Sequence, residues 1–91
     1  MLRGKVIIKP QEEEGKSIFV GVESCMTIGF KNTFGNEAEA IAFTALALIL
    51  ETYPNNADYL QSFEYQLENM TIKFWCINDV DHITYLLPSE Y

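Results

Sequence analysis

The sequence predicts an α+β fold, an antiparallel sheet of five or six strands with one long apolar helix packed across it. Several short segments alternate apolar and polar side chains, which is the period of a half-buried strand. One segment in the middle of the chain is apolar on most of its circumference and has the length of a helix. The chain has only 91 residues, so we expect a single domain that spans residues 1–91.

The first third of the chain predicts three short strands, each bounded by turn-forming residues: 6–8, 17–23 and 26–31. We expect the second and third to form a hairpin with an odd loop at residues 24–26 or an equivalent bulge. That register pairs Val22 with Ile28 and Val20 with Phe30 on one face of the sheet. A two-residue loop would bury polar side chains instead.

The strongest signal is a helix over residues 36–53. Asn36 can cap its first turn, and Pro54 stops it because the residue before a proline avoids the helical region. Apolar side chains cover an arc of about 220° around the axis, which is wider than one sheet face requires. Either a curved sheet wraps this helix, or part of it contacts a second subunit through three small residues, Ala38, Ala42 and Ala45.

Residues 57–68 fit both helical and strand spacing. Phe63, Tyr65 and Leu67 alternate with polar residues, and the segment that follows is rich in β-forming side chains. We therefore favour a three-stranded meander, with at most one helical turn at residues 57–61. The two remaining strands are expected at residues 70–77 and 82–87. Tight turns are expected before them, at residues 68–69 and 78–79.

Charge is divided unevenly along the chain. Residues 1–31 carry a net charge of +1 and residues 32–91 a net charge of −8, for a total of −7. This balance argues against direct binding of nucleic acid. It suits either a solvated surface or a surface that docks on a basic protein partner.

The sequence also limits the compartment. Its longest apolar run, residues 40–50, is far shorter than the ~20 residues of a membrane span, so we expect no membrane partner and a cytoplasmic protein. Two cysteines, Cys25 and Cys76, are too few for a disulfide framework and, with their apolar neighbours, are expected to be buried reduced thiols.

Catalytic and cofactor signatures are missing from the sequence. Its five glycines match neither a dinucleotide fingerprint nor a P-loop. Asp79, Asp81 and His82 offer metal ligands, but there is no second histidine, and Asn78 with Asp79 suits a turn equally well. We expect no enzyme activity, no catalytic residue, no cofactor and no metal site.

A partner-binding surface is the functional hypothesis that the residues favour. Trp75 would anchor the partner, beside Phe19 on a sheet face thinned by Gly21 and Gly29, and carboxylates from the acidic half would surround it. The competing interpretation is that Trp75 covers a second small core. The predicted partner-binding residues are Glu64, Glu68, Asp79, Asp81, Trp75 and Phe19.

In size, acidity and lack of a catalytic signature the chain resembles the small inhibitors that phages encode against host defence or replication proteins. The resemblance is one of class, and it implies a protein partner whose basic, nucleic-acid-binding site is occupied by this chain. The alternative is a homodimer that binds a small ligand or is structural, with its helix forming the dimer contact.

Overall fold

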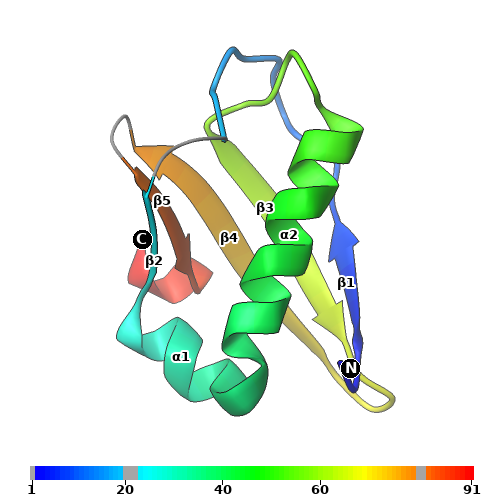
Figure 1. Cartoon of the computed structure of the whole chain (residues 1–91). Helices are drawn as coiled ribbons and strands as arrows, with labels where there is room; N and C mark the ends of the chain where they lie inside the picture. The colour runs from blue at the N-terminus through cyan, green and yellow to red at the C-terminus, as the bar shows by residue number, and fades with distance from the viewer. Residues whose placement is uncertain (1, 20–22, 80–81) are drawn as a thin grey trace.

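A computed structural model describes residues 2–19, 23–79 and 82–91 (Figure 1). Five strands form one sheet in the order β1-β3-β4-β5-β2. All neighbours are antiparallel except β2, which runs parallel to β5. The predicted α+β class, with a long helix packed on a sheet of five or six strands, is confirmed, but the described sheet is mixed rather than wholly antiparallel. The strands are β1 (Lys5–Ile8), β2 (Glu23–Met26), β3 (Leu60–Gln66), β4 (Thr71–Asp79) and β5 (His82–Leu86).

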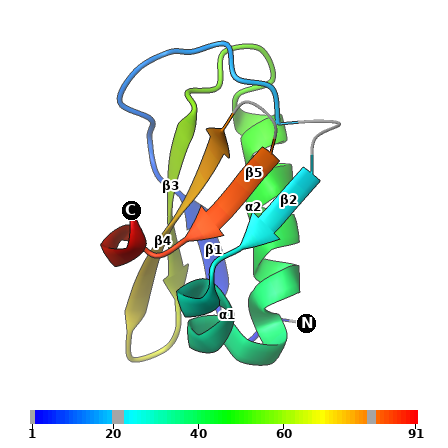
Figure 2. The same ribbon diagram turned by 90° about the vertical axis from the view of Figure 1, so that its left-hand side faces the viewer.

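Two helices connect β2 to β3. The short α1 (Ile28–Phe34) leads through the 3-10 turn η1 (Gly35–Glu37) into α2 (Ala38–Thr52), which packs across one face of the sheet. Gly35 has φ +53° and ψ −126°, a region that is almost closed to residues with a Cβ atom. Figure 2 shows α2 on one side of the sheet and the C-terminal turn η2 (Pro88–Glu90) on the other.

The strand predicted at residues 26–31 is wrong, because this segment contains α1. The Thr27 hydroxyl accepts a hydrogen bond from the Phe30 amide at 3.2 Å and so caps the helix. Phe30 and Phe34 lie one helical turn apart and are both buried, whereas Ile28 is 76% exposed. A pattern of three apolar residues at alternate positions is too short to distinguish a strand from the first turn of a helix.

The predicted hairpin fails for the same reason, since Ile28 and Phe30 are helical and pair with no strand. Its other members, Val20 and Val22, lie outside the described residues, as does Gly21. Of the strand expected at residues 17–23, residues 17–19 are not in a strand and Glu23 begins β2, Glu23–Met26; residues 20–22 lie outside the described residues.

The meander β3-β4-β5 is confirmed. The helical turn considered at residues 57–61 is wrong, because Leu60 and Gln61 begin β3. The first turn lies where it was expected, closed by the Leu67 amide, which donates to the Met70 carbonyl at 2.8 Å. Asn78 and Asp79 extend β4 rather than forming the second turn.

The core lies between α2 and the inner face of the sheet. The ring of Phe74 stacks on Phe63 with centroids 5.0 Å apart, and Phe30 meets Phe74 edge-on at 5.4 Å. The α2 side chains that close this core are Ala38, Ile41, Ala42, Ala45 and Ile49. A dimer contact through the three alanines is therefore wrong, because all three are buried within the chain. The homodimer itself stays a prediction.

The start of α2 is held differently from the expected Asn36 cap. Glu37 is the N-cap residue, and its side chain makes no capping hydrogen bond. Its carboxylate instead accepts from the Arg3 amide at 2.8 Å and from the Tyr65 hydroxyl at 3.0 Å. These hydrogen bonds, with the Arg3 amide contributing most, lower the pKa of Glu37. Through these hydrogen bonds, Glu37 connects the start of α2 to the segment before β1 and to the end of β3.

The helical stretch Ile28–Thr52 meets the length and composition of a membrane span. It is not one straight helix, because η1 separates α1 from α2. The 15 residues of α2 extend over about 22 Å, short of the ~30 Å hydrocarbon core of a bilayer. Since α2 also buries one side against the sheet, we interpret it as the core helix of this fold.

Candidate functional site

The sheet face opposite α2 carries three aromatic side chains, Tyr59, Trp75 and Tyr91, which we call the aromatic face. Trp75 alternates in β4 with the buried Phe74 and Cys76 and so points away from α2. Its ring meets Tyr91 edge-on, with centroids 5.4 Å apart. Tyr59 and Tyr91 are 47% and 72% exposed. Apolar ring surface is therefore available beside polar groups on this face.

Two hollows flank Tyr59. The first, about 440 Å³, we call the acidic hollow; it is lined by Pro10, Gln11, Glu12, Glu13, Asp58, Tyr59, Leu60, Ser62 and Trp75. The second, about 360 Å³, is lined by Tyr59, Ile77, Asn78, Asp79, Thr84, Leu86 and Tyr91. Carboxylates and aromatic rings thus converge on one end of the outward face.

One wall of the acidic hollow is the loop after β1, which folds back along the start of β3. The Lys9 amide donates to the Ser62 carbonyl at 2.8 Å, and the Gly15 amide donates to the Asn56 carbonyl at 3.2 Å. These backbone hydrogen bonds hold both ends of the loop. Between these ends, Glu12 and Glu13 line the hollow together with Asp58.

Gln11 fixes the middle of this loop through its side-chain amide. Its Oε1 accepts from the Asp58 amide at 2.9 Å and from Gln61 Nε2 at 2.8 Å. Its Nε2 donates to the Asn56 carbonyl at 2.9 Å. Gln61 is completely buried and also donates to the Asp58 carbonyl at 3.1 Å. The acidic hollow therefore rests on a hydrogen-bond network rather than on a free loop.

The electrostatics of the hollow favour a cation. Tyr91 is the largest cause of the raised pKa of Tyr59, and the charges of Asp58 and Glu13 raise it further. Ion pairs among the described residues join Arg3 to Glu37 at 3.2 Å and Lys9 to Glu64 at 3.8 Å. Neither pair neutralises a carboxylate of the acidic hollow, so its negative potential is available to a ligand.

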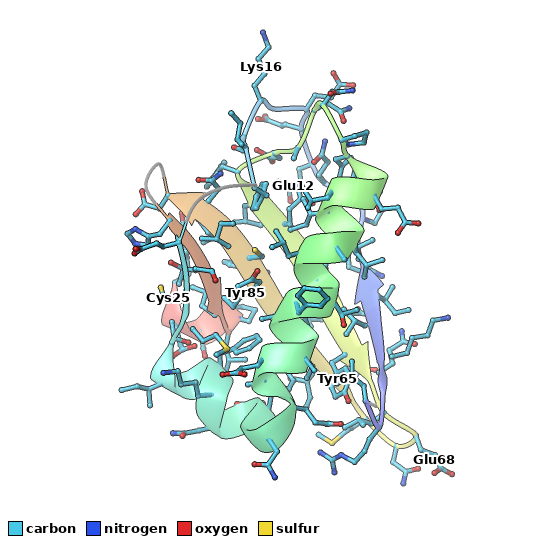
Figure 3. All side chains as sticks on the ribbon, in the orientation of Figure 1. Glu12, Lys16, Cys25, Tyr65, Glu68 and Tyr85 are labelled. Atoms are coloured by element: carbon cyan, nitrogen blue, oxygen red, sulfur yellow. The ribbon has the colours of Figure 1, made fainter. Side chains whose placement is uncertain are left out.

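The predicted site residues lie in different places. Trp75 and Asp79 belong to the outward face and line the two hollows. Glu64 also points outward but pairs with Lys9 and lies opposite Lys73. Glu68 is at the turn between β3 and β4, and Figure 3 shows it at the other end of the molecule from Glu12.

Two predicted residues do not contribute to this face in the described structure. Phe19 is only 3% exposed and belongs to the core cluster with the α2 side chains. The expectation that it shares a face with Trp75 is therefore wrong, because its ring packs on the α2 side of the sheet. Asp81 lies outside the described residues.

Sequence reasoning missed Glu12, Glu13, Asp58, Tyr59 and Tyr91. The run of glutamates before Gly15 was visible, but it reads equally well as a solvated turn. The aromatic residues next to acidic residues, Tyr59 after Asp58 and Tyr91 after Glu90, were the remaining signal. Only the folded chain brings Glu12, Glu13, Asp58 and Tyr59 to the acidic hollow and Tyr91 to the neighbouring one.

Other reactive groups do not form a site with these residues. Among the described residues, no group of three His, Cys, Asp or Glu side chains is placed to hold a metal ion. Cys76 is completely buried, and its burial raises the pKa of its thiol, which interacts with the Tyr85 hydroxyl. This cysteine is therefore a neutral core residue, as expected. The expected burial of Cys25 is wrong, because Cys25 lies exposed on the edge strand β2.

Comparison with known proteins gives no match to a protein-family model, to a curated protein sequence or to a solved structure. The functional argument therefore rests on the geometry of the chain itself.

Proposed function

We propose that this protein is a cytoplasmic, non-enzymatic interaction module that binds a basic protein partner through the acidic hollow and the aromatic face. The observation that carries the proposal is the set of three carboxylates, Glu12, Glu13 and Asp58, without an ion-pair partner among the described residues and next to Trp75. The negative charge of residues 32–91 supports the same type of partner.

An arginine side chain fits the chemistry of the hollow. Its planar guanidinium stacks on aromatic rings and donates to carboxylates in a fixed geometry. The volume of about 440 Å³ lies within the range of small-ligand pockets and accommodates one long side chain. Asp58 Oδ1 accepts from the Tyr59 amide at 2.8 Å, which leaves its second oxygen for a ligand.

A partner that normally binds nucleic acid supplies such side chains. Its basic groups would be attracted to these carboxylates as they are to phosphates, because both carry negative charge. Occupying that site would block the partner's own ligand, so the proposed biological effect is inhibition.

The direct test is a fluorescence titration with an arginine-rich peptide, because Trp75 is the only tryptophan in the chain. We expect the peptide to change the Trp75 emission and to bind more weakly as salt rises. Glu12→Gln with Asp58→Asn should raise Kd about tenfold, equivalent to about 1.4 kcal/mol from two charged contacts.

The matched control is Glu51→Gln with Glu68→Gln, which changes the net charge equally at exposed positions that do not line the hollow. This control pair should leave Kd within about twofold of the value for the unmodified chain, because screened charges away from the bound peptide contribute little. Equal weakening by both pairs would show unspecific attraction to an acidic protein and would overturn the proposed site. A peptide that leaves Trp75 emission unchanged would do the same.

A further inference from the structure

The two edges of the sheet differ in how they are protected. The β1 edge has Lys5 within the strand and Lys9 and Pro10 directly after it, which are residues that prevent another strand from pairing. The other edge, β2, has the sequence Glu23-Ser-Cys-Met26 and carries neither lysine nor proline. In the part of the chain that the structure describes, no strand lies beyond β2.

The pairing of β2 with β5 shows which backbone groups face outward. The Thr27 amide donates to the Tyr85 carbonyl at 3.0 Å. Because the N–H and C=O groups of a strand alternate in direction, Cys25 also faces β5, and the N–H and C=O of Ser24 and Met26 face the free edge. The edge therefore offers two donors and two acceptors to an added strand.

A groove lies between this edge and α2. It holds about 340 Å³ and is lined by Ser24, Cys25, Met26, Glu39, Ala42, Phe43, Leu46 and Tyr85. Figure 3 shows Cys25 on β2 and Tyr85 on the neighbouring strand at this side of the molecule. The Phe43 side chain is 76% exposed although it belongs to the core helix. Every second side chain of a strand added at β2 would face this apolar groove.

The charges at the groove select the occupant. Glu39 lines the groove itself, and Glu23 is exposed on β2. A second copy of this chain would bring like charges together at the same edge, with a net charge of −7 on each copy. A segment with lysine or arginine side chains would instead meet opposite charges.

We infer that the β2 edge binds an extended segment of a partner protein that alternates apolar and basic side chains and adds to the sheet as a further strand. The apolar side chains pack on Phe43 and Leu46, the basic ones meet Glu23 and Glu39, and the free groups of Ser24 and Met26 form the backbone hydrogen bonds. This surface shares no residue with the acidic hollow, so either can fail without the other.

The test uses a peptide of alternating lysine and valine with the full chain, followed by amide hydrogen exchange and NMR shifts. We expect the Ser24 and Met26 amides to exchange about tenfold more slowly when the peptide is bound, while Cys25 changes little. Phe43→Ser and Glu39→Lys should each raise Kd about fivefold or more. Met70→Ser, at the distant turn between β3 and β4, is the control for Phe43 and should leave Kd unchanged.

A glutamate–valine peptide separates the charge requirement from strand addition and should not bind. Binding of the lysine peptide that leaves the Ser24 and Met26 amides unchanged would overturn the proposal. The proposal would also be overturned if these two amides exchanged slowly without peptide and sedimentation showed a dimer, because the β2 edge would then be occupied by a second copy of the chain. Lack of peptide binding at millimolar concentration would also overturn it, whatever the result for the acidic hollow.

Discussion

Removing the Gln11 side chain tests the network that supports the acidic hollow. Gln11→Ala deletes three hydrogen bonds, with the Asp58 amide, the Asn56 carbonyl and Gln61 Nε2, at 2.8–2.9 Å. The Asn56 and Asp58 groups are half-buried and regain water. Gln61 is completely buried: one N–H of its side-chain amide keeps the Asp58 carbonyl as partner, and the other loses Gln11. One buried donor without a partner costs about 1–3 kcal/mol, so we expect a total loss of about 2–4 kcal/mol.

The assay is urea unfolding followed by Trp75 fluorescence and circular dichroism. Glu12→Ala is the control, because its exposed side chain is next in sequence and should change stability by less than ~0.5 kcal/mol. In a double-mutant cycle, Gln61→Leu removes the buried amide, so Gln11→Ala should then cost at least ~1 kcal/mol less. Equal effects of Gln11→Ala and Glu12→Ala, or strict additivity with Gln61→Leu, would refute the network.

Three further outcomes are expected. Ile49 is completely buried, so Ile49→Ala should lower the free energy of unfolding by about 2–5 kcal/mol in the same assay, and a loss below ~0.5 kcal/mol would contradict its place in the core. A thiol reagent at neutral pH should modify only Cys25 in the folded chain and both cysteines in urea; fast reaction of Cys76 would disagree with its burial and raised pKa. Hydrogen bonds from the Thr27 hydroxyl, which contributes most, and from the Leu87 and Gly29 amides lower the pKa of Glu90 below 4.5. The ionised carboxylate therefore stabilises the fold above pH 4.5, and this stabilisation is lost as pH falls through its folded pKa. Glu90→Gln should therefore make acid unfolding curves less steep, and an unchanged slope would count against it.

Local patterns predicted those parts of the fold that depend on neighbouring residues. The alternation around Phe63 and Tyr65 gave the meander, and Pro54 gave the end of the long helix to within two residues. The parallel pairing of β2 with β5 has no local signal, because Glu23 and His82 are far apart in the sequence. The capping hydroxyl of Thr27 was the available sign that residues 28–34 are helical.

The candidate site was predictable only in part, for a related reason. Trp75 lies on β4, whose alternation reveals an outward face, whereas Asp79 was expected in a turn and instead extends the same strand. The acidic hollow instead combines a loop near residue 12 with Asp58 and Trp75, and the side-chain amide of Gln11 joins the loop to Asp58. A hydrogen bond between residues 47 positions apart leaves no periodic trace in a single sequence.

The strand order has a consequence for the synthesis of this protein. Both edge strands, β1 and β2, are made first, but their neighbours come much later: Lys5 pairs with Gln66, and Glu23 pairs with His82. At about 5–20 residues per second, a ribosome needs roughly 3–12 s to make the intervening ~60 residues. During that interval β1 and β2 have no native neighbour in the sheet, because β3 and β5 have not yet been made. The nascent chain is therefore the stage at which β1 and β2 are most accessible to chaperones and proteases.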